Sequence, residues 1–341
     1  MLTTVDRFAY RAQQLGYLVG ATVLQESARV LTRTPRPDLG AVLPLLRART
    51  EALFARDLAN VEAGLYPREL LFQLPTATYA RRLPRLLRDA PKVISRKRRG
   101  DYREVPPVDK AAYPPYYRRT FHWQTDGYLS AHSAAVYDLG VELLFRGTAD
   151  VMRRQIIPPI TRWRRAHAGA GKVRVLDVAC GTGRALHQLA RAHPDLAYHG
   201  VDLSPHYIRA ARALLAEVDQ VTLAAENAEA LPYADATFDV VTSVYLFHEL
   251  PRNARRRVMA ELWRVVKPGG LIVVEDSAQL ADSPELAAVL AGFPVEFHEP
   301  FYADYLEDDL AAMLAATGAT EVTAEPILVA KVVTGRKPDP A

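Results

Sequence analysis

The stretch VRVLDVACGTGRAL at 173–186 constrains the fold more than any other part of the chain. A run of mainly β-branched apolar residues ends at Asp177, the chain passes Gly181 and Gly183, and apolar residues then recur at helical spacing. This pattern predicts a strand, a tight loop and the start of a helix, with a carboxylate at the turn. Glycines allow the backbone to bend sharply and to approach a ligand closely. The loop is therefore predicted to cradle a cofactor.

Two features of this region disfavour a dinucleotide. The dinucleotide fingerprint has a third glycine where this chain has Leu186, and Asp177 stands beside the place that a phosphate would occupy. A second short apolar strand, LAYHGVDLS at 196–204, contains Asp202 near its end, where an acid can accept hydrogen bonds from ribose hydroxyls. The two carboxylates together predict a nucleoside that carries a positive charge and no phosphate.

These residues resemble the class I S-adenosylmethionine-dependent methyltransferases, in the ubiquinone and menaquinone methyltransferase-like branch of small-molecule type, over about 173–334. Asp177, Gly181 and Gly183 match the first motif of that family, and Asp202 matches its ribose-binding acid. Three further segments match in order: AAENAEALPY at 224–233 resembles the adenine loop, FDVVTSVYLFHEL at 238–250 the fourth strand and acceptor site, and LWRVVKPGGLIVVED at 262–276 a helix, a Pro-Gly-Gly turn and the fifth strand. Ala179 departs from the pattern, since the family has a glycine there.

The resemblance implies S-adenosylmethionine as cofactor, EC class 2.1.1, and methyl transfer to a small apolar or aromatic acceptor. It assigns the cofactor contacts to Asp177, Ala179, Gly181, Gly183, Asp202, Leu203, Glu226, Asn227, Ala228, Val244 and Tyr245. Methyl transfer is an in-line displacement at an activated carbon, so the protein mainly aligns the reactants, and a base helps when the acceptor is a hydroxyl or amine. His248 is the candidate catalytic base; the alternative is that it packs beside the cofactor.

The segment PPYYRRTFHWQTDGYLS at 114–130 is unusually aromatic. It fits either a lid over the acceptor or a buried seam between two parts of the chain. Together with an insertion at 279–302 that interrupts the alternation of strands and helices, it supplies the candidate substrate-binding residues His122, Trp123, Gln124, Asp126, Tyr128, His298 and Tyr302. No metal is expected, because the histidines and aspartates lack a ligand spacing.

The second half alternates short apolar runs with helical patterns, which predicts an α/β fold with a Rossmann-like, seven-stranded doubly wound sheet. Five strands are expected near 173–178, 197–201, 220–224, 238–244 and 270–275, with a closing pair near 320–333. The first half is predicted to be mainly helical, including 39–64 and Leu83 to Leu87, with a proline-rich linker over 100–115. We expect a helical domain over 1–113, an aromatic arm with helices covering the active site over 114–172, and a cofactor-binding domain over 173–341.

Charge is distributed unevenly along the chain. Residues 1–172 carry 29 Lys and Arg against 15 Asp and Glu, whereas residues 173–341 carry 14 against 24. The basic clusters at 81–88, 96–99 and 153–165 fit either a surface for nucleic acid or anionic membrane, or a solvated face that also docks on the acidic half. The single cysteine, Cys180, excludes an internal disulfide, and the apolar run at 15–24 is too short to span a bilayer. A cytoplasmic protein with a small-molecule acceptor as its partner is expected.

Three functions are consistent with this sequence. The first is a methyltransferase for a small acceptor. The second is an RNA or protein methyltransferase that docks through the basic N-terminal part, and the third is a cofactor-binding scaffold without turnover.

Overall fold

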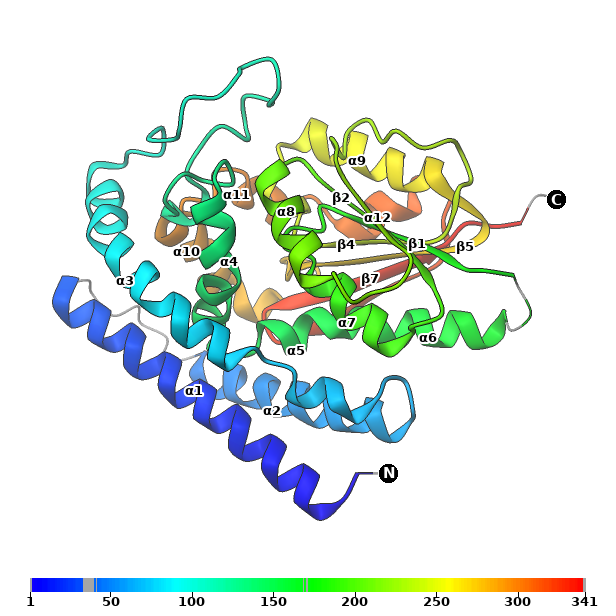
Figure 1. Cartoon of the computed structure of the whole chain (residues 1–341), viewed down its shortest axis with the longest axis horizontal. Helices are drawn as coiled ribbons and strands as arrows, with labels where there is room; N and C mark the ends of the chain where they lie inside the picture. The colour runs from blue at the N-terminus through cyan, green and yellow to red at the C-terminus, as the bar shows by residue number, and fades with distance from the viewer. Residues whose placement is uncertain (1, 33–39, 41, 168, 170, 340–341) are drawn as a thin grey trace.

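The computed structural model describes residues 2–32, 40, 42–167, 169 and 171–339. Its second half is a seven-stranded sheet covered by helices on both faces, and its first half is helical (Figure 1). The predicted fold class is therefore confirmed. The helix predicted at 39–64 starts at a residue outside the described part of the chain. The helix in the structure, α2, spans Leu43–Glu62.

The strands follow the order β3-β2-β1-β4-β5-β7-β6 across the sheet. Their bounds are β1 Arg174–Val178, β2 Ala197–Asp202, β3 Val221–Ala225, β4 Phe238–Val244, β5 Val266–Ser277, β6 Thr320–Ile327 and β7 Ala330–Arg336. The first five pair in parallel, and β7 runs antiparallel to both β5 and β6. The chain order reverses between β1 and β4, and in open sheets ligands bind beyond the carboxyl ends of the strands at such a switch point.

Successive apolar residues of the central strands point to opposite faces of the sheet. On β1, Val175 belongs to one buried cluster and Leu176 to another, and β4 divides Val240 and Val241 in the same way. Both faces are apolar because both are covered, as is usual for parallel sheets. One face carries α6 (Ile157–Ala166), α7 (Arg184–Ala192) and α8 (Pro205–Leu214), and the other carries α9 (Arg252–Val265) and α12 (Leu310–Ala315).

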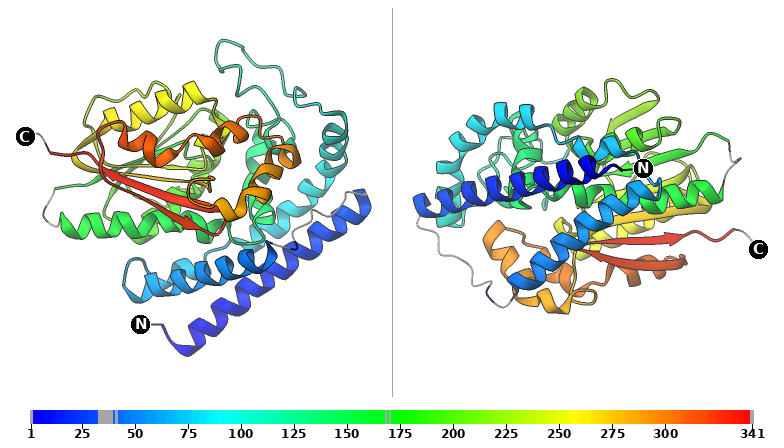
Figure 2. Two further views of the ribbon diagram at one scale, coloured as in Figure 1. Left: turned by 180° about the vertical axis from the view of Figure 1, so that it is seen from behind. Right: turned by 90° about the horizontal axis from the view of Figure 1, so that it is seen from below.

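The first half adds the helices that extend the molecule beyond the sheet (Figure 2). They are α1 Thr4–Thr32, α2 Leu43–Glu62, η1 Arg68–Phe72, α3 Thr76–Arg99, η2 Phe121–Trp123, α4 Ala131–Leu144, α5 Ala149–Arg153 and η3 Arg154–Ile156. Tyr10 of α1 and Leu53 of α2 share one apolar cluster with Val175 of β1. The core of the sheet thus continues into the N-terminal helices.

Two local predictions need correction. The helix expected at Leu83 to Leu87 is the middle of the much longer α3, which holds Pro84 and Pro91 inside it and packs against α4. Tertiary contacts compensate there for the hydrogen bonds that the prolines remove. The Pro-Gly-Gly segment expected as a turn before the fifth strand lies within β5, where the pairing with β4 shifts register between Phe238 and Val240. Such a bulge accommodates the extra residues without ending the strand.

Part of the basic N-terminal charge is internal. Arg154 is buried and forms an ion pair with Asp57, and buried Arg153 pairs with Asp150. Asp150 also pairs with Arg184, the first residue of α7. These arginines are thus bound to acids inside the protein, whereas Arg81, Arg85 and Arg88 of α3 are exposed. In the described part of the chain, none of the helices combines the length and hydropathy that a bilayer crossing requires.

Candidate functional site at the carboxyl ends of the strands

A cavity lies beyond the carboxyl ends of β1, β2 and β4, at the switch point of the sheet. Nine of the eleven predicted cofactor residues line it, namely Ala179, Gly181, Asp202, Leu203, Glu226, Asn227, Ala228, Val244 and Tyr245. The other two, Asp177 and Gly183, stand behind this lining. Its volume is about 90 Å³, whereas drug-sized ligand sites occupy roughly 300–1,000 Å³. A nucleoside therefore enters only if part of the wall moves.

The glycine loop turns through left-handed backbone, with φ +62° at Ala179 and +58° at Gly181. A Cβ on Gly181 would meet no protein atom within 4 Å, so this side of the loop is open to a ligand. Gly183 has a different role, because a Cβ there would lie 3.1 Å from Leu215 and 3.2 Å from Ala211. It allows α7 to begin close against α8.

The two carboxylates that the sequence predicted occupy different environments. Asp202 lines the cavity, and its Oδ2 accepts the Gly181 N–H at 3.0 Å. Asp177 is buried below the loop, where its Oδ1 accepts the Thr242 hydroxyl at 2.8 Å and its Oδ2 has no hydrogen-bond partner. Burial raises the pKa of Asp202 to about 6 and that of Asp177 to about 7.

The predicted adenine loop forms another wall of the cavity. Asn227 Oδ1 accepts the Glu229 N–H at 2.9 Å, which closes an Asx turn. One lone pair of this amide oxygen is therefore already used. Glu229 in turn accepts the Tyr116 hydroxyl at 2.5 Å, so the loop is fastened to the aromatic segment.

His248 lies at the acceptor end, in the short 3-10 helix η4 (Phe247–Glu249) that follows β4. The ring is buried, and its Nδ1 lies 2.6 Å from Oδ1 of Asp276 near the end of β5. Asp276 also accepts the Phe247 N–H at 2.6 Å. Burial alone would lower the pKa of His248, but the Asp276 carboxylate outweighs it and raises that pKa. With Nδ1 held by Asp276, Nε2 is the ring atom left for chemistry.

The aromatic segment covers this end of the cavity. Tyr117 and Tyr128 line it, and the Tyr128 hydroxyl donates to Glu249. His122 lies between two carboxylates, with Nε2 3.4 Å from Glu249 Oε1 and Nδ1 3.1 Å from Glu299 Oε1. Burial lowers the pKa of His122, but the two glutamates together raise it above its ordinary value.

The remaining predicted substrate residues contact other side chains and backbone groups around the cavity. Trp123 donates from Nε1 to the Glu296 carbonyl at 3.1 Å and packs on His298, with ring centroids 4.8 Å apart. Tyr302 is buried beside His248, at 5.9 Å between ring centroids. Gln124 bonds to Tyr207 in the scaffold, and Asp126 has a left-handed backbone with φ +66°. Of the seven predicted substrate residues, only Tyr128 lines the cavity.

Several residues of the site escaped prediction. Tyr137 and Tyr207 line the cavity from α4 and α8, where their periodic spacing reads as ordinary helix packing. Asp276 follows the apolar run of β5, just as Asp177 and Asp202 follow theirs. The same end-of-strand argument would have identified it.

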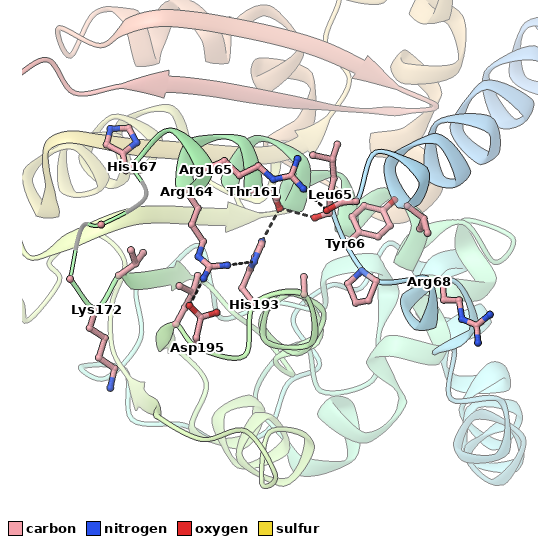
Figure 3. Close-up of a pocket in the computed structure, with 18 residues that line it drawn as sticks. Leu65, Tyr66, Arg68, Thr161, Arg164, Arg165, His167, Lys172, His193 and Asp195 are labelled. Carbon is pink, nitrogen blue, oxygen red and sulfur yellow. Dashed lines mark hydrogen bonds and ion pairs between the residues drawn. The ribbon is translucent and has the colours of Figure 1, made fainter. Parts of the chain in front are cut away.

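A second and larger cavity, of about 810 Å³, lies at the amino ends of the strands (Figure 3). It is lined by Leu196 and Val173, which precede strands β2 and β1, and by cationic residues of α6. Arg164 there already pairs with Asp195 and lies 3.2 Å from His193. None of the predicted site residues lines this cavity. Parallel sheets bind ligands at the carboxyl ends of their strands, and this cavity lies at the amino ends.

The chain is similar to known methyltransferases. The family model described as a methyltransferase domain matches residues 175–270. The chain is 36% identical over 151 residues to an O-methyltransferase of Aspergillus nomiae, covering 42% of this chain and 63% of that protein. It is 31% identical over 189 residues to the ubiquinone/menaquinone biosynthesis C-methyltransferase of Desulfotalea psychrophila, covering 53% of this chain and 75% of that protein.

Among solved structures, a SAM-dependent methyltransferase from Aquifex aeolicus has a TM-score of 0.38 and 20% identity, covering 50% of this chain and 86% of that chain. The chain spans 63% and 54% of the lengths of two curated relatives that it matches, the Aspergillus nomiae protein and a demethylmenaquinone methyltransferase of Deinococcus radiodurans.

Proposed function

Because the chain belongs to the S-adenosylmethionine-dependent methyltransferases, we propose that it methylates a small aromatic acceptor that bears a hydroxyl group. The observation that carries this proposal is the cavity at the switch point, which joins the predicted cofactor residues to an end walled by tyrosines and by Glu249, the neighbour of His248. The cofactor of the family supplies a methyl group that the adjacent sulfonium activates for displacement.

The residues present fit that cofactor. Gly181 leaves open the space that a Cβ would fill, Asp202 presents a carboxylate for ribose hydroxyls, and Asp177 has an unpartnered carboxylate oxygen below the loop. We assign Asn227 and Ala228 to the adenine, and Val244 and Tyr245 to the methionine side. Because Asp177 lies behind the lining, it acts on the amine through the loop or an intervening water.

The acceptor end favours an aromatic ring. Tyr117, Tyr128 and Tyr137 offer ring faces and edges for stacking. These tyrosines also exclude water, so that an acceptor is held in line with the methyl group. His248 lies beside this end, with Nε2 3.9 Å from Oε1 of the lining residue Glu249; we propose that Nε2 receives the acceptor proton while Asp276 holds the ring in position.

A small acceptor is favoured over RNA or protein by the enclosed acceptor end and by the internal pairing of Arg153 and Arg154. The three-part division of the chain and a cytoplasmic location stay predictions from the amino-acid sequence. The hypothesis of a cofactor-binding scaffold also stays a prediction, and methyl transfer by the chain would exclude it.

The test is incubation of the full chain with methyl-labelled S-adenosylmethionine and a panel of hydroquinones and polyketide-like phenols. We expect label in a low-molecular-weight product whose mass has increased by one methylene group. Label found only in the RNA or protein of an added extract would contradict a small acceptor, and no label in any fraction would contradict turnover.

A further inference from the structure

We propose that His122, His248, Glu249 and Glu299 bind one divalent transition-metal ion, of the Zn²⁺ class, at the acceptor end of the cavity. One ligand atom from each of these residues lies within 4.8 Å of all the others. Two imidazoles and two carboxylates form a mixed nitrogen and oxygen donor set, which suits such ions.

The spacing of the donor atoms fits a shared ion. His122 can give only one ring nitrogen to the ion: Nδ1 lies 3.1 Å from Glu299 Oε1 and Nε2 lies 3.4 Å from Glu249 Oε1, so binding through either nitrogen requires the other glutamate to move. His248 Nε2 lies 3.9 Å from that Glu249 oxygen. Ligands bound about 2.1 Å from one tetrahedral ion stand about 3.4 Å from each other. Small side-chain shifts would thus complete the coordination.

The unpartnered atoms provide a second, independent observation. Glu299 is completely buried and neither of its carboxylate oxygens accepts a hydrogen bond; its Oε1 has only His122 Nδ1 nearby, at 3.1 Å, and its Oε2 has no polar partner. Among the described residues, neither Lys nor Arg forms an ion pair with Glu249 or Glu299. Two carboxylates that share only the His122 imidazole as a counter-charge are costly to bury. A bound cation would supply the missing charge and the missing partners.

The surrounding residues hold the donors as metal ligands are usually held. Asp276 bonds Nδ1 of His248 and so directs Nε2 toward the cluster, which is the carboxylate–histidine arrangement common at metal sites. The Tyr128 hydroxyl donates to Glu249 in the same manner. Left-handed backbone at His122 (φ +51°) and His298 (φ +52°) lies at or next to two of the ligands. Strain of this kind often accompanies functional sites.

The role of the ion rests on the proposed function. An acceptor hydroxyl bound to the ion would lose its proton to solvent more readily, since a bound cation lowers the pKa of the hydroxyl. The resulting oxygen anion attacks the methyl carbon; the oxygen–carbon bond forms as the carbon–sulfur bond breaks, and the sulfonium becomes a neutral thioether. With the ion bound, Nε2 of His248 is a metal ligand and no longer takes the acceptor proton. The ion instead activates the acceptor hydroxyl.

Metal uptake by the full chain tests the proposal. The protein is stripped with EDTA, equilibrated with Zn²⁺, Mn²⁺ or Co²⁺ in turn, and its bound metal is measured by mass spectrometry and calorimetry. We expect one ion per chain, bound at least tenfold more weakly by His122→Gln, Glu249→Gln and Glu299→Gln. The matched controls are Glu296→Gln, in the same segment and paired with Lys97, and His206→Gln on α8.

Thermal unfolding identifies any variant that does not fold, and the other two site variants then decide the outcome. Absence of stoichiometric uptake, or equal weakening by the control variants, would overturn the metal site and leave an imidazolium between two carboxylates. S-adenosylmethionine affinity is measured on the same stripped protein. Cofactor binding without metal uptake contradicts only the ion, whereas metal uptake without cofactor binding contradicts only the proposed function.

Discussion

The backbone N–H of Gly181 donates a hydrogen bond to Oδ2 of Asp202 at 3.0 Å. This bond joins the loop after β1 to the end of β2, two segments that are neighbours only because the strands pair. It fixes the carboxylate beside the open face of the loop. The position of the acid that we propose to bind the ribose is thus set by the fold before any ligand arrives.

The two loop glycines should respond differently to substitution. Gly181→Val places a side chain into the open space of the cavity, so we expect S-adenosylmethionine affinity to fall at least tenfold. Gly183→Val instead meets Ala211 and Leu215, and we expect a loss of about 1–3 kcal/mol in the free energy of unfolding. Calorimetry and urea unfolding on both variants separate the two roles. Equal effects of both variants on affinity would contradict the assignment.

Asp177 should make the ligand-free protein less stable as pH rises. Its folded pKa, about 7, lies above the ordinary value of 3.8 for this carboxyl group, so the folded state holds the proton up to a higher pH than the unfolded state does. Stability from this group is therefore complete at low pH and is lost between about pH 4 and pH 7. The gain in stability of Asp177→Asn over the natural protein should grow by on the order of 2 kcal/mol from pH 5 to pH 8. A gain that does not change with pH would contradict this.

Breaking the buried ion network below the loop should destabilise the fold. Asp150→Ala leaves Arg184 buried without its carboxylate and Arg153 with only Glu142, at 3.7 Å, and we expect the free energy of unfolding to drop by about 3–5 kcal/mol. The control is Asp195→Ala, which removes an exposed pair with Arg164 and should cost less than about 1 kcal/mol. Urea titration measures both variants. Comparable losses would show that burial of the network contributes little.

His248 should matter for transfer and not for cofactor binding. We expect His248→Asn to lower kcat at least 100-fold with an acceptor found in the labelling experiment, since His248 lies beside the proposed acceptor end and outside the cofactor lining. The dissociation constant for S-adenosylmethionine should change less than about threefold. His199→Asn, a histidine on β2, serves as control. Undiminished turnover would exclude His248 from the chemistry.

The cofactor half of the site could be predicted because its signals are local in sequence. Asp177, Gly181 and Asp202 each stand next to a strand that its own apolar run reveals. The acceptor half has no such signal. His122, Glu249 and Glu299 meet only because η2, η4 and the segment after α10 (Ala287–Phe297) pack together.

The errors in the fold have a similar origin. Pro84 and Pro91 predict breaks, yet α3 continues through both because it packs on α4. Gly269 and Gly270 predict a turn, yet both lie within β5, which carries them as a bulge against β4. In both places a long-range contact outweighs a local preference.

The central claim is that the cleft at the carboxyl ends of β1, β2 and β4 holds S-adenosylmethionine. Calorimetric titration of the full chain tests it directly, with NADH as competitor and Asp202→Ala as the matched variant. We predict 1:1 binding with a dissociation constant in the range of about 1 μM to 1 mM, unaffected by NADH and not measurable in Asp202→Ala. Binding of NADH in place of S-adenosylmethionine, or undiminished binding by Asp202→Ala, would contradict the claim.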